Sequence, residues 1–377
     1  MRVVRIETKL VSVPLGKGNW VYTLLHTDEG LVGVSEVTAR RWEQAIERGI
    51  HEVGRYLIGK DPTDIEDLWE KMYRDSFWVG GPLHATCISA LEWAMWDLLG
   101  KKLRVPVYKL VGGPTRTKIR VYAHVDGATP EELQNAAKDA LRRGYTAVKT
   151  RVGPGGDARR KETEFIGRSF FDGVQKKMEI LRDAVGRDID IAVDAHGNFS
   201  PSDAIRVGRI LEDFDVLFYE EPVPPENIDG LAEVAHKLRI PVATGERLAT
   251  VYSFRDVLAR DAVAVLQPDV CNVGGLSQAR KIAGMAEAHY RAIAPHNPNG
   301  PLATIMSMQF AASIPNFLIL ESTGHQQQID AASHLINDYP ELVDGHYELP
   351  KGPGLGVSLN LDEMDKYPYQ PVDNMLR

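Results

Sequence analysis

Three acidic residues at one regular spacing are the part of this sequence best suited to bind a metal ion. Asp194, Glu220 and Glu246 lie 26 residues apart, and each follows a short apolar run that predicts a β-strand. Three carboxylates brought together repel one another strongly unless a cation lies between them. An all-oxygen set of ligands favours Mg²⁺, with Mn²⁺ as the alternative, over zinc. Taken singly, each acid would more simply cap a helix or form an ordinary salt bridge.

Other polar residues end neighbouring predicted strands and extend this pattern. Together with the three acids, they are Lys149, Asp194, Glu220, Glu246, Asp269, His296 and Glu321. After a longer first gap, successive members lie 23 to 27 residues apart, which fits the length of one strand–helix unit. Each residue therefore occupies the same place in successive units, and we expect all of them to converge on one mouth of a barrel.

Two histidines at or near these positions indicate acid–base chemistry. Asp269 and His296 end consecutive strands, so the Asp269 carboxylate can bond one imidazole nitrogen and make His296 a general base. The alternative is a histidine that bonds to the backbone of its own proline-rich loop. His196 lies two residues after Asp194 and points the same way if the strand continues. It is either a general acid or a structural histidine beside the metal.

Lys149 and Arg151 are the cationic residues of the pattern. They alternate along one predicted strand, so both are expected to face the barrel mouth. There they would bind a substrate carboxylate, and Lys149 would also stabilise enolate charge. The alternative is an interior ion pair with Glu220 or Asp194.

Eight short β-rich runs alternate with helical stretches after residue 115 and carry these residues. The runs are Ile119–Ala123, Thr146–Thr150, Ile189–Val193, Val216–Tyr219, Pro241–Thr244, Val263–Leu266, Arg291–Ala294 and Phe317–Leu320. Such alternation predicts parallel βα units, and eight of them favour an α/β fold of the (β/α)8 barrel type over an open sheet.

The first 115 residues have a different order, with strands followed by helices. Val3–Val13 and Val21–Thr27 alternate apolar with polar residues, and helical patterns follow over 38–58 and over 82–99, the second ended by Gly100. This order predicts a separate α+β domain over 1–115. The barrel is then expected over 116–345, and a turn-rich C-terminal segment over 346–377 is expected to pack back on the first domain.

The composition excludes several classes of protein. Of 377 residues 44% are hydrophobic and 25% are charged, and the formal charge is −8 with no basic arm, so we expect no nucleic-acid partner. Cys87 and Cys271 form no CxxC pair, which favours a reducing, cytoplasmic environment. Because the start has no apolar signal core and no apolar run is long enough to span a bilayer, we expect no membrane partner.

Longer motifs around the strand ends carry a family resemblance. They are Val-Asp-Ala-His-Gly (193–197), Tyr-Glu-Glu-Pro (219–222), Gly-Glu-Arg-Leu (245–248), Gln-Pro-Asp (267–269) and Ala-Pro-His-Asn (294–297). With Ser-Ala-Leu-Glu-Trp-Ala-Met-Trp-Asp-Leu-Leu-Gly-Lys in the first domain, the sequence resembles the enolase superfamily, mandelate racemase subgroup, over essentially its whole length. The Phe-Trp-Val-Gly-Gly-Pro segment (77–82) and the Pro-Gly-Leu-Gly ending (353–356) are most similar to the D-galactonate dehydratase-like acid-sugar dehydratases.

The resemblance implies a capping α+β domain on a modified barrel of (β/α)7β type and one Mg²⁺ per chain. It implies a carbon–oxygen lyase that removes the proton α to a carboxylate and eliminates the 3-hydroxyl of a small acid sugar, giving a 2-keto-3-deoxy acid. The implied roles are Mg²⁺ binding by Asp194, Glu220 and Glu246, the base by the His296–Asp269 pair, the acid by His196, and substrate contact by Glu321. Because barrels of this kind often assemble, a homo-oligomer is expected.

Arg151 is a departure from the family pattern. In the racemases of the subgroup that this sequence resembles, a second lysine occupies this position and is a base. The guanidinium of an arginine instead stays protonated and cannot accept the proton. One-base elimination is therefore favoured over the reaction of an epimerase, racemase or cycloisomerase. A sugar-acid-binding relict without activity is disfavoured because the metal, base and acid positions are all present. The dehydratases it resembles have a neutral residue there, so an aldonate of another length or configuration, or a diacid whose far carboxylate meets Arg151, remains open.

Loops of the first domain are expected to cover the barrel mouth in this subgroup. They correspond to 16–20, 36–42 and 77–81, and the residues expected to contact the distal part of the substrate include Trp20, Glu36 and Trp78. Ordinary packing between the domains is the alternative for each of them.

Overall fold

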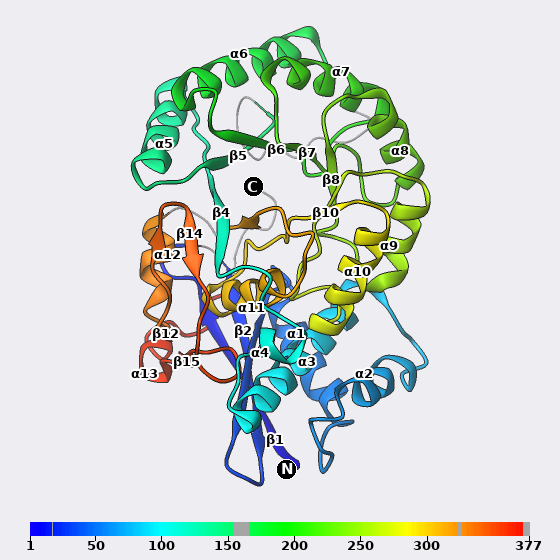
Figure 1. Ribbon diagram of the computed structural model, residues 1–377, viewed down its shortest axis with the longest axis vertical. Helices are drawn as coiled ribbons and strands as arrows, with labels where there is room; N and C mark the ends of the chain where they lie inside the picture. Colours follow the sequence, from blue (N-terminus) through cyan, green and yellow to red (C-terminus); the bar gives the residue numbers. More distant parts are fainter. Residues whose placement is uncertain (17, 154–165, 323–325, 372–377) are drawn as a thin grey trace.

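The computed structural model describes residues 1–16, 18–153, 166–322 and 326–371, and the chain forms an α+β part and a barrel (Figure 1). The α+β part, here called the capping domain, has an antiparallel sheet in the order β1-β2-β3. Its elements are β1 (Val3–Ser12), β2 (Asn19–Thr27), β3 (Val32–Val37), α1 (Glu43–Gly54), α2 (Ile65–Arg74), α3 (Gly81–Leu103) and α4 (Val107–Leu110).

The helix α3 forms the centre of the capping domain. Most of its side chains are buried around the whole circumference, a pattern typical of a helix covered on every side. It packs against β2 and β3 and also against the barrel helix α10 (Leu276–Ala288). The helix therefore connects the small sheet to the barrel.

Parallel strands form the barrel, and in the described residues the last strand, β11, pairs with the first, β4. A parallel bridge between Ile293 and Phe317 joins the segment of β11 to β10 and closes the ring. The strands are β4 (Lys118–His124), β5 (Ala147–Arg151), β6 (Asp190–Asp194), β7 (Phe218–Glu220), β8 (Val242–Thr244), β9 (Val265–Leu266), β10 (Ala292–Ile293) and β11 (Leu320–Glu321). Each overlaps one of the predicted runs. The predicted barrel with a preceding α+β domain is therefore confirmed.

Helices lie on the outside of these strands (Figure 1). They are α5 (Pro130–Arg142), α6 (Arg168–Val185), α7 (Pro201–Leu211) with the 3₁₀ turn η1 (Glu212–Phe214), α8 (Ile228–Lys237), α9 (Thr250–Ala259), α10 (Leu276–Ala288), α11 (Pro301–Ala312) and α12 (Gln326–Ser333). The last elements are β12 (Ile336–Asn337), β13 (Leu342–Val343), β14 (His346–Glu348), β15 (Ser358–Leu359) and α13 (Leu361–Met364).

The interior of the barrel holds one layer of buried apolar side chains, one from each strand or its immediate neighbour. The layer consists of Tyr122, Ala147, Ala192, Phe218, Ala243, Val265, Ala294 and Ile319. Because side chains alternate across a strand, residues two positions further along point inward as well, one layer closer to the carboxyl ends. That next layer includes Lys149, Asp194 and Glu220, which is why strand-end residues of this chain converge.

One helix end was predicted wrongly. The glycine pattern predicted that the helix over 82–99 ends at Gly100, but α3 continues to Leu103 and ends with Arg104 in the left-handed region. A side chain at position 100 would lie 2.6 Å from the Cα atom of Gly354, so Gly100 permits a close approach of the C-terminal segment instead of ending the helix.

The C-terminal segment contacts both parts of the chain. Within it, β14 pairs antiparallel with β4 at the edge of the barrel. Further on, Tyr367 accepts a backbone hydrogen bond from Ser12, and the side chain of Asn19 donates to the carbonyl of Gln370.

The helices of the described residues include none with both the length and the apolar composition that a bilayer span requires.

Candidate active site

Lys149 lies at the centre of the polar layer above the apolar one. Its Nζ atom is 3.1 Å from both carboxylate oxygens of Glu220, 2.9 Å from Glu321 and 3.4 Å from Asp194. Burial opposes its charge, but these carboxylates outweigh burial and raise the pKa of Lys149 well above its usual value. The interior ion pair that the sequence left open is therefore present, and Lys149 is a charged interior cation.

The predicted metal-binding acids lie near one another but are not equivalent. Asp194 and Glu220 face each other across neighbouring strands in register, and both are buried. Burial and the adjacent Asp194 charge raise the pKa of Glu220 to about 8, whereas Lys149 and His196 overcome burial and hold that of Asp194 below its usual value. The raised pKa of Glu220 reflects the cost of a further negative charge beside Asp194, whereas the lowered pKa of Asp194 reflects the cations next to it.

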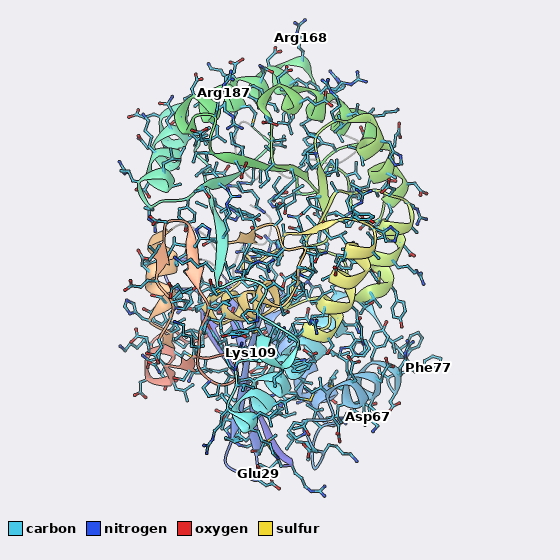
Figure 2. The ribbon with its side chains drawn as sticks, viewed as in Figure 1. Glu29, Asp67, Phe77, Lys109, Arg168 and Arg187 are labelled. Atoms are coloured by element: carbon cyan, nitrogen blue, oxygen red, sulfur yellow. The ribbon has the colours of Figure 1, made fainter. Side chains whose placement is uncertain are left out.

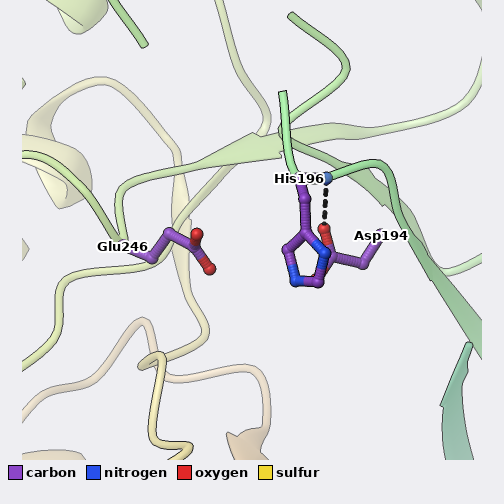
Figure 3. Close-up of side chains that lie close together, drawn as sticks. All are labelled: Asp194, His196 and Glu246. Atoms are coloured by element: carbon purple, nitrogen blue, oxygen red, sulfur yellow. Dashed lines mark hydrogen bonds and ion pairs between the residues drawn. The ribbon is translucent and has the colours of Figure 1, made fainter. Parts of the chain in front are cut away.

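Asp194, His196 and Glu246 form a cluster whose ligand atoms lie within 4.8 Å of one another. Figure 3 shows Asp194 and His196 on one segment and the Glu246 carboxylate directed toward them from another. Glu220 is not in this cluster, because both of its oxygens accept from Lys149. The structure thus brings two of the three predicted ligands together with a histidine that the sequence had interpreted as an acid.

His296 is bonded on both sides of its ring. Its Nδ1 atom is 2.8 Å from Asp269 Oδ2, and its Nε2 atom is 3.1 Å from Glu246 Oε2. Burial opposes the charged ring, but Glu246, Glu321 and Asp269 raise the pKa of His296 well above its usual value. Asn299 donates to both oxygens of Asp269, at 3.2 and 3.0 Å, and orients the carboxylate.

His196 reaches the cluster through a turn and not through a continued strand. The strand β6 ends at Asp194, and His196 adopts a left-handed backbone with φ 49°. Its N–H donates to Asp194 Oδ1 at 2.8 Å, and its Nε2 atom is 3.0 Å from Asp194 Oδ2. Burial opposes the proton, yet Asp194 raises the pKa of His196 to about 9. The side chain stays 44% exposed, so it is open to a ligand in the mouth.

Arg151 does not form one positive pair with Lys149. Its Nε atom donates to Asp126 Oδ2 at 2.9 Å, and Lys177 contacts the other oxygen of Asp126 at 3.3 Å. Two cations thus share one carboxylate on the rim, while Lys149 is bound by acids below. Asp126 follows the first barrel strand, and nothing in the strand-end spacing had pointed to it.

The three predicted distal contacts lie in different environments. Glu36 is fully buried and its carboxylate accepts from the backbone N–H groups of Gly300, Leu302 and Ala303, so the geometry does not support a substrate contact there. Trp20 is buried and lines a small cavity with Thr304, Ser322 and other residues.

Trp78 is 84% exposed and packs edge-on against Phe77. Figure 2 places Phe77 at the outer edge of the molecule and not over the middle of the barrel. The predicted cover of the mouth by the 77–81 loop is therefore absent from the described conformation.

Two further polar residues of the mouth were not singled out from the sequence. His124 ends β4 and bonds Glu321 Oε1 through Nε2 at 2.7 Å. Its position, two residues after the interior Tyr122, is the signal that would have found it. Arg247 forms an ion pair with the buried Glu221 at 2.5 Å, and both follow predicted metal ligands directly in the sequence.

Comparison with known proteins places this geometry in a family. Residues 132–364 match the family described as enolase C-terminal domain-like, and residues 5–112 match the mandelate racemase / muconate lactonizing enzyme N-terminal domain. The chain belongs to the enolase superfamily. The resemblance stated from the motifs is therefore confirmed, including its mandelate racemase/muconate lactonizing enzyme branch.

Similar proteins within this superfamily carry the names of dehydratases. The chain is 34% identical to the D-galactonate dehydratase of Pectobacterium atrosepticum, over 90% of this chain and 89% of that protein. It is 34% identical to the D-xylonate dehydratase of Haloferax volcanii, over 97% and 88%. A solved mandelate racemase/muconate lactonizing enzyme from Jannaschia sp. CCS1 superposes with a TM-score of 0.92 at 32% identity, covering 100% of both chains.

Proposed function

We propose that this chain is a Mg²⁺-dependent acid-sugar dehydratase. The reaction removes the proton α to a carboxylate, expels the 3-hydroxyl as water and gives a 2-keto-3-deoxy acid. The observation that carries the proposal is that two histidines contact different carboxylates of one cluster: His296 contacts Glu246, and His196 contacts Asp194. An elimination needs one group that accepts a proton and another that donates one, and this arrangement provides both.

His296 is suited to accept the α-proton at Nε2. Asp269 bonds Nδ1 and thereby fixes the ring orientation and the tautomer that leaves Nε2 facing the cluster. The C–H electron pair then moves into the bond between C2 and C3. The same Asp269 contact stabilises the imidazolium that forms.

His196 is suited to protonate the leaving hydroxyl. Asp194 raises the pKa of His196, and the partial exposure of its side chain leaves the ring accessible to a ligand in the mouth. As the bond between C3 and oxygen breaks, the donated proton completes the water molecule. The enol that remains tautomerises to the 2-keto acid, so atoms and electrons balance without an oxidant or reductant.

The donor set fits a divalent cation. Asp194, Glu220 and Glu246 would hold it, because burial and Asp194 raise the pKa of Glu220 to about 8 even though Lys149 contacts both of its oxygens, so a further cation would be favourable there. When bound, the ion would hold the substrate carboxylate and would offset the charge of Glu246, which contacts His296 Nε2 and favours the protonated ring there.

Arg151 restricts which reactions and which substrates are compatible with the site. A guanidinium remains protonated, so it cannot be the second base of an epimerase or racemase. Its positively charged guanidinium lies on the rim, paired with Asp126, which Lys177 also contacts. That charge favours a substrate with a polar or anionic distal end, which is an aldonate or an aldarate.

A substrate panel tests the proposal. Purified protein with Mg²⁺ is incubated with aldonates and aldarates of five and six carbons, and a 2-keto-acid colour reaction reports the product. We expect turnover of at least one member and none by a His296→Asn variant. Turnover of no member would refute the proposal, whereas α-proton exchange in D₂O without loss of the 3-hydroxyl would indicate an epimerase.

A further inference from the structure

We propose that the capping domain positions the catalytic base by holding the N-termini of α10 and α11 with two buried carboxylates, Glu92 and Glu36. The inference rests on the proposed function in one respect, that His296 and Asp269 form the base. Asp269 lies in the segment between β9 and α10, and His296 in the segment between β10 and α11. Each half of the base is thus directly followed by a helix that the capping domain holds.

Glu92 holds the start of α10. From α3, its Oε2 atom accepts from the N–H of Leu276 at 2.8 Å, and its Oε1 atom accepts from the N–H and the hydroxyl of Ser277 at 2.9 and 2.6 Å. Trp96 donates to the same carboxylate at 2.7 Å. Glu92 is completely buried, so these hydrogen bonds replace the water that would otherwise solvate its carboxylate.

Glu36 holds the start of α11 in the same way. From the capping strand β3, its Oε1 atom accepts from the N–H of Gly300 at 2.5 Å, and its Oε2 atom accepts from Leu302 at 2.9 Å and Ala303 at 3.3 Å. It too is completely buried. Gly300 lies four residues after His296, and Asn299 between them bonds Asp269.

Glycine at both helix starts makes room for these carboxylates. The residues that precede the two helices are Gly275 and Gly300, which have no side chain to cap their own helix. An added Cβ at Gly275 would lie 2.3 Å from Glu92 Oε2, and one at Gly300 would lie 2.3 Å from Glu36 Oε1. The capping carboxylates therefore replace the side-chain caps that glycine cannot supply.

Further contacts fix the segment between Asp269 and α10 to the capping domain. Trp93 donates to the carbonyl of Val270 at 3.0 Å, and Trp69 donates to that of Gly274 at 2.8 Å. Ser89 accepts from the N–H of Gly274 at 2.9 Å. The backbone that carries Asp269 is thus bonded to α2 and α3 along its length.

These contacts matter because a general base works only in a narrow geometry. A displacement of about 1 Å can lower a rate by about a hundredfold. The His296–Asp269 contact spans two segments, and the capping domain holds the start of the helix that follows each of them. Glu36 and Glu92 are therefore positioning residues, which act on the substrate only through the dyad.

A double variant separates positioning from simple helix capping. Glu36→Ala removes the carboxylate and vacates the space that a side chain at position 300 needs, and Gly300 has an ordinary φ of −84° that serine accepts. In Glu36→Ala with Gly300→Ser, the serine hydroxyl caps α11 from its own chain. The matching change at Gly275 is unsuitable, because its φ is +91°.

We expect Glu36→Ala to lower both Tm and kcat, the latter by about tenfold to a hundredfold, with KM changed much less. Adding Gly300→Ser should restore most of Tm but leave kcat low. Recovery of kcat together with Tm would show that Glu36 is only a helix cap and would overturn the proposal. Glu36→Gln, which keeps the volume and one acceptor oxygen, serves if the alanine variant does not fold.

A readout without turnover keeps this proposal separate from the proposed function. In protein labelled with ¹⁵N-histidine, the hydrogen-bonded Nδ1–H of His296 is assigned by its loss in His296→Asn. We expect this resonance to shift or broaden in the double variant and to stay unchanged in Asp97→Asn. Asp97 is a matched control, because it is also a fully buried carboxylate that accepts backbone N–H groups, from Val34 and Leu355, but contacts neither dyad segment.

An unchanged resonance in the double variant would refute positioning even if the chain is a dehydratase. A shifted resonance in a protein that turns over no acid sugar would support positioning of the histidine while the proposed function fails.

Discussion

The two halves of the barrel hold their active-site residues by different means. In the half that carries Asp194 and His196, the helices α5, α7 and α8 are capped by Thr129, Ser200 and Asn227 of their own chain segments. In the half that carries Asp269 and His296, α10 and α11 begin after glycine and are capped by acids of another domain. In the first half α6 begins after Gly167 without a side-chain cap, so local capping holds for α5, α7 and α8, whereas α10 and α11 depend on the docked capping domain.

The largest effect on stability is expected in the half that depends on the capping domain. Glu92→Ala would leave the buried N–H groups of Leu276 and Ser277 and the partly buried Trp96 indole without their acceptor. Each unsatisfied group costs about 1–3 kcal/mol, so the free energy of unfolding should fall by at least about 3 kcal/mol. Denaturant unfolding measures this change, and a loss below about 1 kcal/mol would contradict the dependence on Glu92.

The same half should show a distinctive pH dependence of stability. Burial raises the pKa of Glu36 from an ordinary 4.5 to about 7, so between these values the folded chain holds a proton that the unfolded chain releases. The stability contribution of Glu36 is then complete below pH 4.5, decreases as the pH rises to about 7, and is constant above it. The decrease amounts to about 3 kcal/mol.

Thermal unfolding of the natural chain and Glu36→Gln from pH 4 to 9 measures this contribution, because the glutamine side chain does not titrate. As the pH rises to about 7, the natural chain should lose stability relative to Glu36→Gln. A difference that instead grows with pH would mean that the three N–H donors outweigh burial.

Metal affinity distinguishes the residues of the locally capped half from one another. Glu220→Gln should weaken Mg²⁺ binding by about tenfold or more, because it removes one charged ligand, whereas His196→Asn should change it by less than about threefold. Calorimetry, or the electron paramagnetic resonance of bound Mn²⁺, gives both values. The reverse order would assign the ion to the Asp194–His196–Glu246 cluster that the side chains form in the described conformation.

The smallest effects are expected at the local caps. Ser200 accepts from the N–H of Asp203 at 3.2 Å, and Asn227 accepts from that of Gly230 at 2.9 Å. Replacing either with alanine should lower the unfolding free energy by about 1 kcal/mol and leave kcat unchanged. A tenfold fall in kcat from either change would show that the active-site residues of the locally capped half also depend on contacts far from them.

The same division explains what could be predicted from the sequence. The barrel and its strand-end residues follow from two periodic patterns, the alternation of strands with helices and the alternation of side chains along each strand. Both patterns are local, so Lys149, Asp194 and Glu220 could be placed in one interior layer before their contacts were known.

Contacts between distant segments could not be predicted in this way. Glu36 was interpreted as a substrate contact because it begins the loop 36–42 expected to cover the mouth, but its partner Gly300 lies 264 positions away. The partner of Arg151, Asp126, lies outside the regular spacing of the strand ends. Gly100 carries the sequence signal of a helix end, yet the close approach of Gly354 is what requires it.

The division of roles between the two histidines is the central claim, and α-proton exchange in D₂O tests it most directly. With an acid sugar that the natural chain dehydrates, deuterium at C2 of recovered substrate is followed by NMR for two variants. His196→Asn should lose dehydration but still exchange the α-proton through His296, whereas His296→Asn should lose both. Exchange that persists in His296→Asn and disappears in His196→Asn would reverse the assignment and contradict the account.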